Sequence, residues 1–196
     1  MMELFNTTTN VISQGKVRRG SWAAYLPVDH GDIEEFLQVR SEGHPIQDIS
    51  MAVCIPNYWM EEMIGGDVKK REIMAKIHKK RSETGYPYIF FTDNVNDGKP
   101  QWYKDQDMEI KHSQLCAEIM EYTDEDKSFV CCLSSMNLLH YDEWKGTNAV
   151  KVLTNLLEAV YTEFVEKASG VPFLEKAVRF AEDHRSIGVG ALGYHS

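Results

Sequence analysis

The sequence predicts an α/β fold, and three observations lead to that prediction. Short apolar runs rich in β-compatible residues occur at residues 21–28 and 51–55. Each run is followed by a segment whose apolar residues recur at helical spacing. Hydrophobic residues make up 43% of the 196 residues, which is enough for a sizeable core. We therefore expect strands and helices to alternate within one globular piece.

The first half of the chain is expected to contain alternating strands and helices. Asp29 or Asp32 can cap the first helix, Asn57 can cap the second, and Gly65-Gly66 can close it. The turn signals Asp97-Gly98 and Pro100 predict a loop after the last apolar element. The expected elements are a polar loop (6–20), a strand (21–28), a helix (29–40), a strand (51–55), helices (57–64 and 68–82), an apolar strand-like element (88–92) and a loop (94–101).

The second half begins with two apolar segments, 110–119 and 129–133, whose acidic and polar spacer predicts a hairpin-like excursion. The clearest helix follows at residues 147–168, and its apolar stripe is expected to pack in the core. Pro172 can open a further helix over 171–184. The end of the chain carries Gly188-x-Gly190-x-x-Gly193, but neither a helix nor an acidic residue follows it, so we reject a dinucleotide-binding site.

Composition excludes several function classes. A formal net charge of −9 argues against a nucleic-acid-binding chain, because phosphate neutralisation needs a basic surface. The basic clusters at 69–71 and 79–81 are expected on a solvated helix face. No apolar run approaches the roughly 20 residues that span a bilayer, and the N-terminus lacks a signal-peptide pattern. We expect no nucleic-acid or membrane partner and a cytoplasmic location.

Four cysteines lack the spacing of a metal site, so no metal ligands are predicted. Cys54 lies in an apolar run and is expected to be a packed residue. Cys116 and Glu118 are two residues apart, so in an extended segment both side chains would leave the same face. Two other interpretations remain for Cys116: a buried small residue, or a nucleophile paired with His112 or His140 in a thiol hydrolase.

The polar loop at residues 6–20 combines fixed cations with glycines. Gln14, Arg18 and Arg19 could contact an anion or a nucleotide, because guanidinium groups make forked hydrogen bonds and glycine permits close backbone approach. The alternative is a surface turn with solvated arginines.

Four motifs in this order give the chain a family resemblance. They are QGKVRRG (14–20), TGYPYIFFTD (84–93), SQLCAEI (113–119) and RSIGVG (185–190). From about residue 6 to the end, the chain resembles the large, catalytic α subunit of class I ribonucleotide reductase. The finger loop of that family reads Asn-Leu-Cys-x-Glu-Ile, and here Gln114 takes the place of the asparagine.

The resemblance implies a piece of the family's ten-stranded α/β barrel. Because the family chain is several times longer, residues 1–196 would be a central part of the barrel domain. The parts would be a specificity-type loop at 6–20, a finger-loop region at 110–138 and helices within 147–184.

The implied activity is radical-based reduction of ribonucleoside diphosphates to deoxyribonucleotides for DNA synthesis. By resemblance, Cys116 would form the thiyl radical, Glu118 would be the general base and Gln114 would position the substrate. Cys131 would be one thiol of a redox-active pair whose partner lies upstream of Met1. Adjacent Cys132 would close only a strained ring.

The resemblance also implies a set of partners. Gln14, Arg18 and Arg19 would belong to the loop that links nucleotide effectors (ATP or dNTP) to substrate choice. This chain would bind no cofactor directly, and the radical would come from a metal-containing small subunit. Companion large-subunit fragments and a thioredoxin- or glutaredoxin-type reductant would complete the enzyme.

A chain of this length is expected to be inactive alone. A split gene and a truncated reading frame both fit, and the Met1-Met2 start favours the first. The alternative is a non-catalytic assembly or regulatory fragment of the same enzyme. If a phage encodes the chain, its location would be the host cytoplasm.

Overall fold

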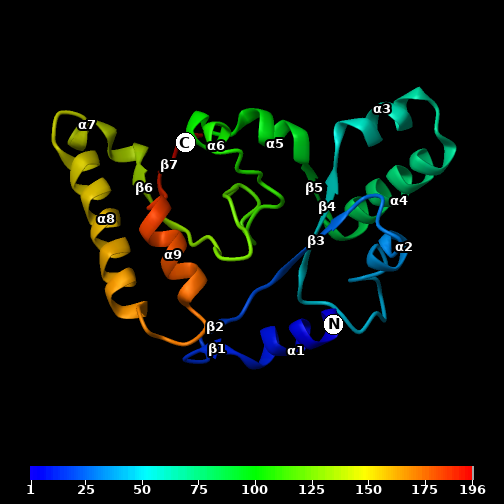
Figure 1. Ribbon diagram of the computed structural model, residues 1–196, viewed down its shortest axis with the longest axis horizontal. Coiled ribbons are helices and arrows are strands. Elements are labelled where there is room, and N and C mark those ends of the chain that lie inside the picture. Colours follow the sequence, from blue (N-terminus) through cyan, green and yellow to red (C-terminus); the bar gives the residue numbers. More distant parts are fainter. Residues whose placement is uncertain (196) are drawn as a thin grey trace. The chain divides into compact units, whose positions relative to one another are not determined.

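The computed structural model describes residues 1–195, which form two compact units, Met1–Glu121 and Tyr122–Ser196 (Figure 1). The first unit contains a three-stranded parallel sheet in the order β3-β4-β5. The second contains a parallel pair, β6-β7. Parallel strands joined through helices confirm the predicted α/β class.

The sheet of the first unit is made of β3 (Ala23–Pro27), β4 (Ser50–Ile55) and β5 (Tyr88–Phe91). The central strand β4 is buried from Met51 to Ile55, as expected for a parallel strand covered on both faces. Cys54 is part of this run, and burial raises the pKa of its thiol to about 11. The prediction that Cys54 is a packed residue is therefore confirmed.

Helices α2 (Ile33–Phe36), α3 (Asn57–Gly65) and α4 (Val68–Thr84) complete this part of the unit. The helix predicted over 29–40 is wrong in length: it is a single turn, because Gln38 and Val39 switch to i→i−3 hydrogen bonds. Pro56, not Asn57, occupies the N-cap of α3. Lys80 is only 5% exposed, so the basic cluster at 79–81 is not wholly solvated.

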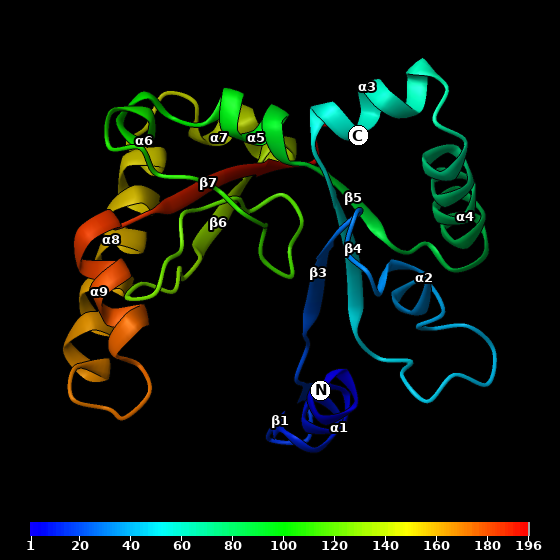
Figure 2. The ribbon, with the colours of Figure 1, turned by 45° about the vertical axis from the view of Figure 1, so that its right-hand side comes forward.

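Two loop predictions are also wrong. Residues 94–101 fall mostly in helices α5 (Thr92–Gly98) and α6 (Gln101–Asp105). The polar segment 6–20 begins in helix α1 (Met2–Val11), where Thr8 and Thr9 satisfy their hydroxyls on carbonyls one turn earlier. A small antiparallel hairpin follows, formed by β1 (Ser13–Gln14) and β2 (Arg18–Arg19). Figure 2 shows α1 and β1 beside each other before the start of β3.

The second unit pairs β6 (Cys132–Asn137) with β7 (Ile187–Leu192). The glycine-rich end of the chain is therefore a strand, whereas the hairpin predicted between 110–119 and 129–133 is wrong, because residues 110–131 contain no strand. Gly190 fits the pairing, because a Cβ there would lie 2.7 Å from the Ser135 hydroxyl oxygen. The glycine pattern therefore serves strand packing.

Helices α8 (Ala149–Ala168) and α9 (Glu175–His184) pack beside β6 and β7 (Figure 1), and η1 (Leu138–His140) and α7 (Tyr141–Trp144) precede them. Leu157, Tyr161 and Phe180 are buried, but the stripe of α8 is only partly covered, since Leu156 is 57% exposed. Helix α9 begins later than predicted, after Phe173 adopts a φ of 70°. None of the helices within residues 1–195 is long and apolar enough to cross a membrane.

Candidate active site

Cys116 and Glu118 share one tight turn in the first unit. The Ile119 amide donates to the Cys116 carbonyl at 3.0 Å, which places Ala117 and Glu118 at the turn's centre. The Gln114 amide donates to the Ile119 carbonyl at 2.9 Å and closes the base of this loop. The extended segment expected here is wrong, yet the thiol and the carboxylate are both exposed on the same turn.

Helix α5 holds the segment that leads into this turn. The Asn96 side-chain amide donates to the Ile110 carbonyl, its oxygen accepts from the Ile110 amide, and both distances are 2.9 Å. Lys99 donates to the Met108 carbonyl at 2.7 Å. The sequence predicts a loop at residues 94–101 and carries no local signal that marks Asn96 as a tertiary contact, so this anchor could not be predicted.

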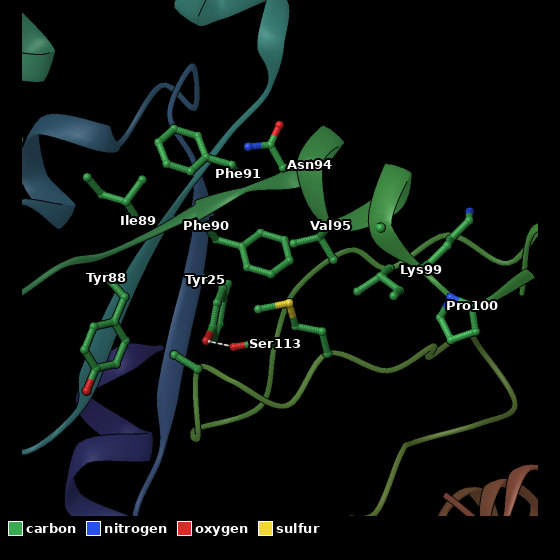
Figure 3. Close-up of a pocket in the computed structure, with 14 residues that line it drawn as sticks. Tyr25, Tyr88, Ile89, Phe90, Phe91, Asn94, Val95, Lys99, Pro100 and Ser113 are labelled. Atoms are coloured by element: carbon green, nitrogen blue, oxygen red, sulfur yellow. Dashed lines mark hydrogen bonds between the residues drawn. The ribbon is translucent and has the colours of Figure 1, made fainter. Parts of the chain in front are cut away.

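Strand β3 holds the other side of the turn. The Tyr25 hydroxyl donates to the Gln114 carbonyl at 2.8 Å and shares a hydrogen bond with the Ser113 hydroxyl (Figure 3). Ser113 is 2% exposed, and its hydroxyl oxygen also lies 3.0 Å from the Gln114 carbonyl oxygen, so its single proton can be donated either to this carbonyl or to Tyr25. Sequence reasoning assigned Tyr25 to a buried strand and gave Ser113 no role.

A cavity of about 480 Å³ lies against this turn, within the first unit. Tyr25, Phe90 and Val95 line it, as Figure 3 shows, and Ala117 and Met120 of the turn segment also contribute. Side chains therefore fill the space on the inner side of the turn only in part. The position of the turn depends correspondingly more on its polar contacts than on packing.

The arginine hairpin is built on α1. Gln14 pairs with Arg18 across the hairpin, and Gly15 and Lys16 both adopt left-handed backbone angles in the connecting turn. The Gly20 amide donates to the Ile12 carbonyl at 2.9 Å, which ties the hairpin to α1. Arg18 and Arg19 are exposed and, as successive strand residues, point to opposite faces. The Gln14 side chain lies outside the described part of the structure.

Cys131 is half-buried at the entrance to β6 in the second unit. The carbonyl of Val130 accepts a hydrogen bond from Tyr161 of α8 at 2.8 Å. The neighbouring Cys132 thiol faces α8, where it donates to the Leu157 carbonyl at 3.7 Å, and burial raises its pKa. Because successive residues of a strand alternate, Cys131 is expected on the face away from α8.

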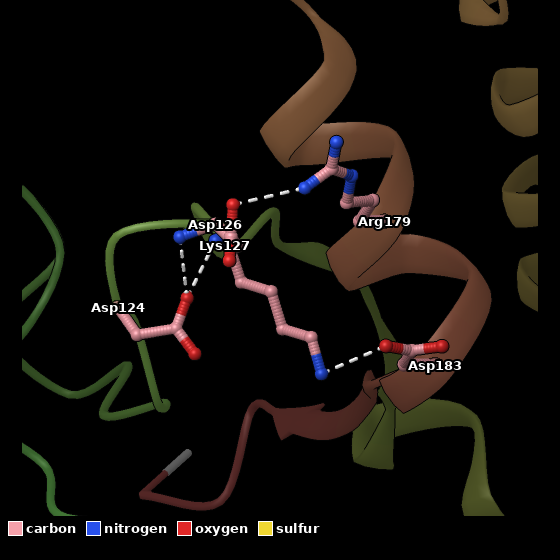
Figure 4. A network of polar contacts seen from close by, with 5 residues as sticks. All are labelled: Asp124, Asp126, Lys127, Arg179 and Asp183. Atoms are coloured by element: carbon pink, nitrogen blue, oxygen red, sulfur yellow. Dashed lines mark hydrogen bonds and ion pairs between the residues drawn. The ribbon is translucent and has the colours of Figure 1, made fainter.

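An ion-pair network fixes the acidic segment before Cys131 onto α9 (Figure 4). The amides of Asp126 and Lys127 both donate to the Asp124 carboxylate at 2.7 Å. Lys127 then pairs with Asp183 at 2.7 Å, and Arg179 pairs with Asp126 at 3.0 Å. The hydrogen bond and charge of Lys127 lower the pKa of Asp183.

The two histidines considered as bases have other contacts. Nδ1 of His112 lies 2.9 Å from the Ser113 carbonyl, and the His112 ring tilts against Tyr25. Nδ1 of His140, in the second unit, pairs with Glu143 at 2.8 Å. Among residues 1–195, no group of three or more His, Cys, Asp or Glu side chains could hold a metal ion.

Comparison with protein families gives a match over the whole chain. The model described as the ribonucleotide reductase barrel domain matches residues 1–66 and 62–196. The two stretches meet at the end of α3, where residues 62–66 belong to both.

Two viral relatives carry names from the same family. A putative ribonucleoside-diphosphate reductase large subunit of Frog virus 3 is 37% identical over 92% of this chain and 36% of its own length. The ribonucleoside-diphosphate reductase large subunit of Invertebrate iridescent virus 3 is 26% identical over 100% of this chain and 42% of its own length. The chain therefore spans well under half of each relative.

A solved structure shares the fold closely. The class Id ribonucleotide reductase α subunit of Actinobacillus ureae matches with a TM-score of 0.91 and 50% sequence identity, over 98% of this chain and 36% of that chain.

Proposed function

Since the chain belongs to the ribonucleotide reductase barrel-domain family, we propose that it supplies the catalytic turn of a ribonucleoside-diphosphate reductase large subunit. The observation that carries the proposal is the turn that exposes Cys116 and Glu118 together, with Gln114 at its base. A thiol and a carboxylate on one exposed turn can both reach one bound ribose.

The chemistry assigns one step to each residue. A thiyl radical at Cys116 takes the hydrogen from C3′ of the ribose and returns it at the end. Glu118 accepts the proton of the 3′ hydroxyl as general base. The amide of Gln114 can donate to and accept from the substrate. With a radical at C3′, the 2′ hydroxyl takes a proton from a thiol and leaves as water.

The reaction also consumes two electrons and two protons. A dithiol supplies them as it closes to a disulfide, and Cys131 is our candidate for one member. The second thiol would come from a large-subunit segment outside this sequence. A thioredoxin- or glutaredoxin-type protein would then reduce the disulfide for the next turnover.

The arginine hairpin is our candidate for the effector-linked loop. Arg18 is exposed on a strand whose connecting turn places Gly15 at a φ of 56°, which glycine adopts without strain, and an exposed guanidinium suits contact with a nucleotide phosphate or base. One similar solved structure is named a class Id α subunit, and we propose that a partner subunit supplies the radical, so that this chain binds no radical cofactor itself. A small subunit and ATP or dNTP effectors complete the proposed assembly.

The test is deoxynucleotide formation from a ribonucleoside diphosphate. The chain is combined with the remaining large-subunit segments, a radical-generating small subunit and a dithiol reductant. We expect activity with the native chain, none with Cys116→Ser, and near-native activity with the control Cys132→Ser, whose hydroxyl can keep the bond to the Leu157 carbonyl.

Two other outcomes would contradict the catalytic proposal. Activity that survives Cys116→Ser would remove the thiyl assignment. Stable association of the chains without any deoxynucleotide, under conditions where a complete α subunit is active, would favour the assembly or regulatory fragment.

A further inference from the structure

Among the described contacts, hydrogen bonds from Tyr25 connect the turn that carries Cys116 and Glu118 to the sheet. The Tyr25 hydroxyl, on β3, reaches the Gln114 carbonyl at 2.8 Å although the two residues are 89 positions apart in sequence. The Ser113 hydroxyl lies within hydrogen-bonding distance of both the Tyr25 hydroxyl and the same carbonyl, and its single proton can serve either acceptor. Two hydroxyls therefore converge on the carbonyl of Gln114, the residue whose amide closes the turn.

The surroundings of this contact make it important for the position of the turn. Ala117 and Met120 face a cavity of about 480 Å³, so the turn lacks close packing on that side. Asn96 and Lys99 hold the chain only as far as Ile110. Between Ile110 and the turn, Ser113 is the buried polar residue, at 2% exposure, and its hydroxyl is satisfied by Tyr25 and Gln114.

We propose that Tyr25, acting with Ser113, is a positioning residue that sets the orientation of the Gln114–Ile119 turn and thereby of Cys116 and Glu118. The catalytic part of this inference rests on the proposed reductase function. Tyr25 touches neither the thiol nor the carboxylate through a hydrogen bond in the described contacts, and it acts through the Gln114 backbone.

The protonation state of Tyr25 supports this role. Burial raises the pKa of Tyr25, although the hydrogen bond with Ser113 opposes the shift. The phenol therefore stays protonated at neutral pH and keeps the donor that the Gln114 carbonyl needs.

The first experiment measures amide hydrogen exchange of residues 113–120 in the chain with Tyr25→Phe. This variant removes one hydroxyl and leaves the ring in place. Losing one tertiary hydrogen bond should speed exchange at the Gln114 and Ile119 amides about five-fold. Tyr88→Phe is the matched control, because Tyr88 lines the same cavity from β5 and hydrogen-bonds Tyr86 instead.

The exchange result decides the structural part by itself. Faster exchange confined to residues 113–120, absent from Tyr88→Phe, supports the proposal. Unchanged exchange in the turn would overturn it. A uniform rise over the whole first unit would also overturn it, because Tyr25 would then only stabilise the fold.

The second experiment tests the catalytic part in the reconstituted enzyme. With Tyr25→Phe we expect kcat to fall roughly ten-fold while KM for the ribonucleoside diphosphate stays within two-fold, since the reacting groups are misplaced but binding contacts remain. An unchanged kcat would overturn the positioning role. If the native assembly makes no deoxynucleotide, the proposed function fails, and the exchange experiment still tests the contact.

Discussion

At the residue scale, Cys131 lies just before β6 and Cys132 is its first residue, and we expect the two thiols to have different surroundings. Cys132 is turned toward α8 and bonds the Leu157 carbonyl, and burial raises its pKa. Cys131 precedes it by one position and is expected on the opposite face. A redox thiol must be reachable by a partner thiol, so we expect Cys131, and not Cys132, to take the proposed redox role.

This difference predicts unequal effects of the same substitution. Cys131→Ser should abolish multiple turnovers that depend on a thioredoxin-type reductant, because no disulfide can form and be recycled. Cys132→Ser should retain at least half of the native rate. Steady-state deoxynucleotide formation by both reconstituted variants checks the prediction, and equal loss in the two would contradict the assignment.

At the element scale, the junction between α3 and α4 is a tight turn. Gly66 adopts a φ of 115°, and Arg71 donates to the Met63 and Ile64 carbonyls at 2.9 Å. The two stretches of the family match meet here, and the alignment with the Invertebrate iridescent virus 3 protein extends over 269 positions, more than this chain has residues. Relatives therefore carry residues that this chain lacks.

The turn predicts opposite results for two neighbouring glycines. Gly66→Ala should lower the free energy of unfolding by about 1–2 kcal/mol, because a side chain is strained at this backbone angle. Gly65→Ala lies in helical backbone with open space around its Cβ, so stability should be unchanged or slightly higher. Urea unfolding of both variants measures the difference; similar losses would argue against the turn geometry.

The contact between residues 124–127 and α9 predicts an acid-sensitive element. Lys127 lowers the pKa of Asp183 in the folded state. Its stabilising contribution is therefore full above the unfolded value, near pH 4, and is lost as the pH falls through the lower folded value. Because Asp183 is largely exposed, the loss should stay below about 1 kcal/mol.

The variant Asp183→Asn should reduce the fall in second-unit stability between pH 5 and pH 2. The matched control is Asp142→Asn, because it removes an exposed carboxylate of α7 that pairs with Lys145. Unfolding monitored at several pH values compares them. An acid dependence that is identical in the native protein and Asp183→Asn would contradict the prediction.

At the scale of the whole molecule, the chain holds two compact units and spans 36% of the Actinobacillus ureae α subunit. A barrel strand at the edge of an incomplete sheet leaves unpaired backbone groups, which need another strand or a cover. The proposed reaction likewise needs a second redox thiol. Both arguments support the proposed assembly with further large-subunit segments.

A chimera tests this at the appropriate scale. Residues 1–196 would replace the matching segment of the Actinobacillus ureae α subunit, with which they share 50% identity and a TM-score of 0.91. We expect a folded chimera that reduces ribonucleoside diphosphates and loses activity with Cys116→Ser. A folded but inactive chimera would indicate that Gln114, in place of the family's asparagine, does not support catalysis.

Local sequence was sufficient for most elements but not for their partners. The strands at residues 21–28 and 51–55 and the helix at 147–168 were predicted because apolar spacing reports which face is buried. The helices at 92–98 and 101–105 were missed because Asn, Asp, Gly and Pro are strong turn signals. Helix α5 nevertheless forms, and its Asn96 side chain bonds the Ile110 backbone as well as the Thr92 carbonyl of its own turn.

The sequence by itself determined the α/β class, the family resemblance and the residues that carry the proposed chemistry, since each is written in a short local pattern. Only the tertiary structure decided that Cys116 and Glu118 share a turn, that β6 pairs with β7, and that Tyr25 and Ser113 hold Gln114. The strand pairing and the Tyr25 contacts join residues dozens of positions apart, and their free energy depends on packing that no local propensity contains.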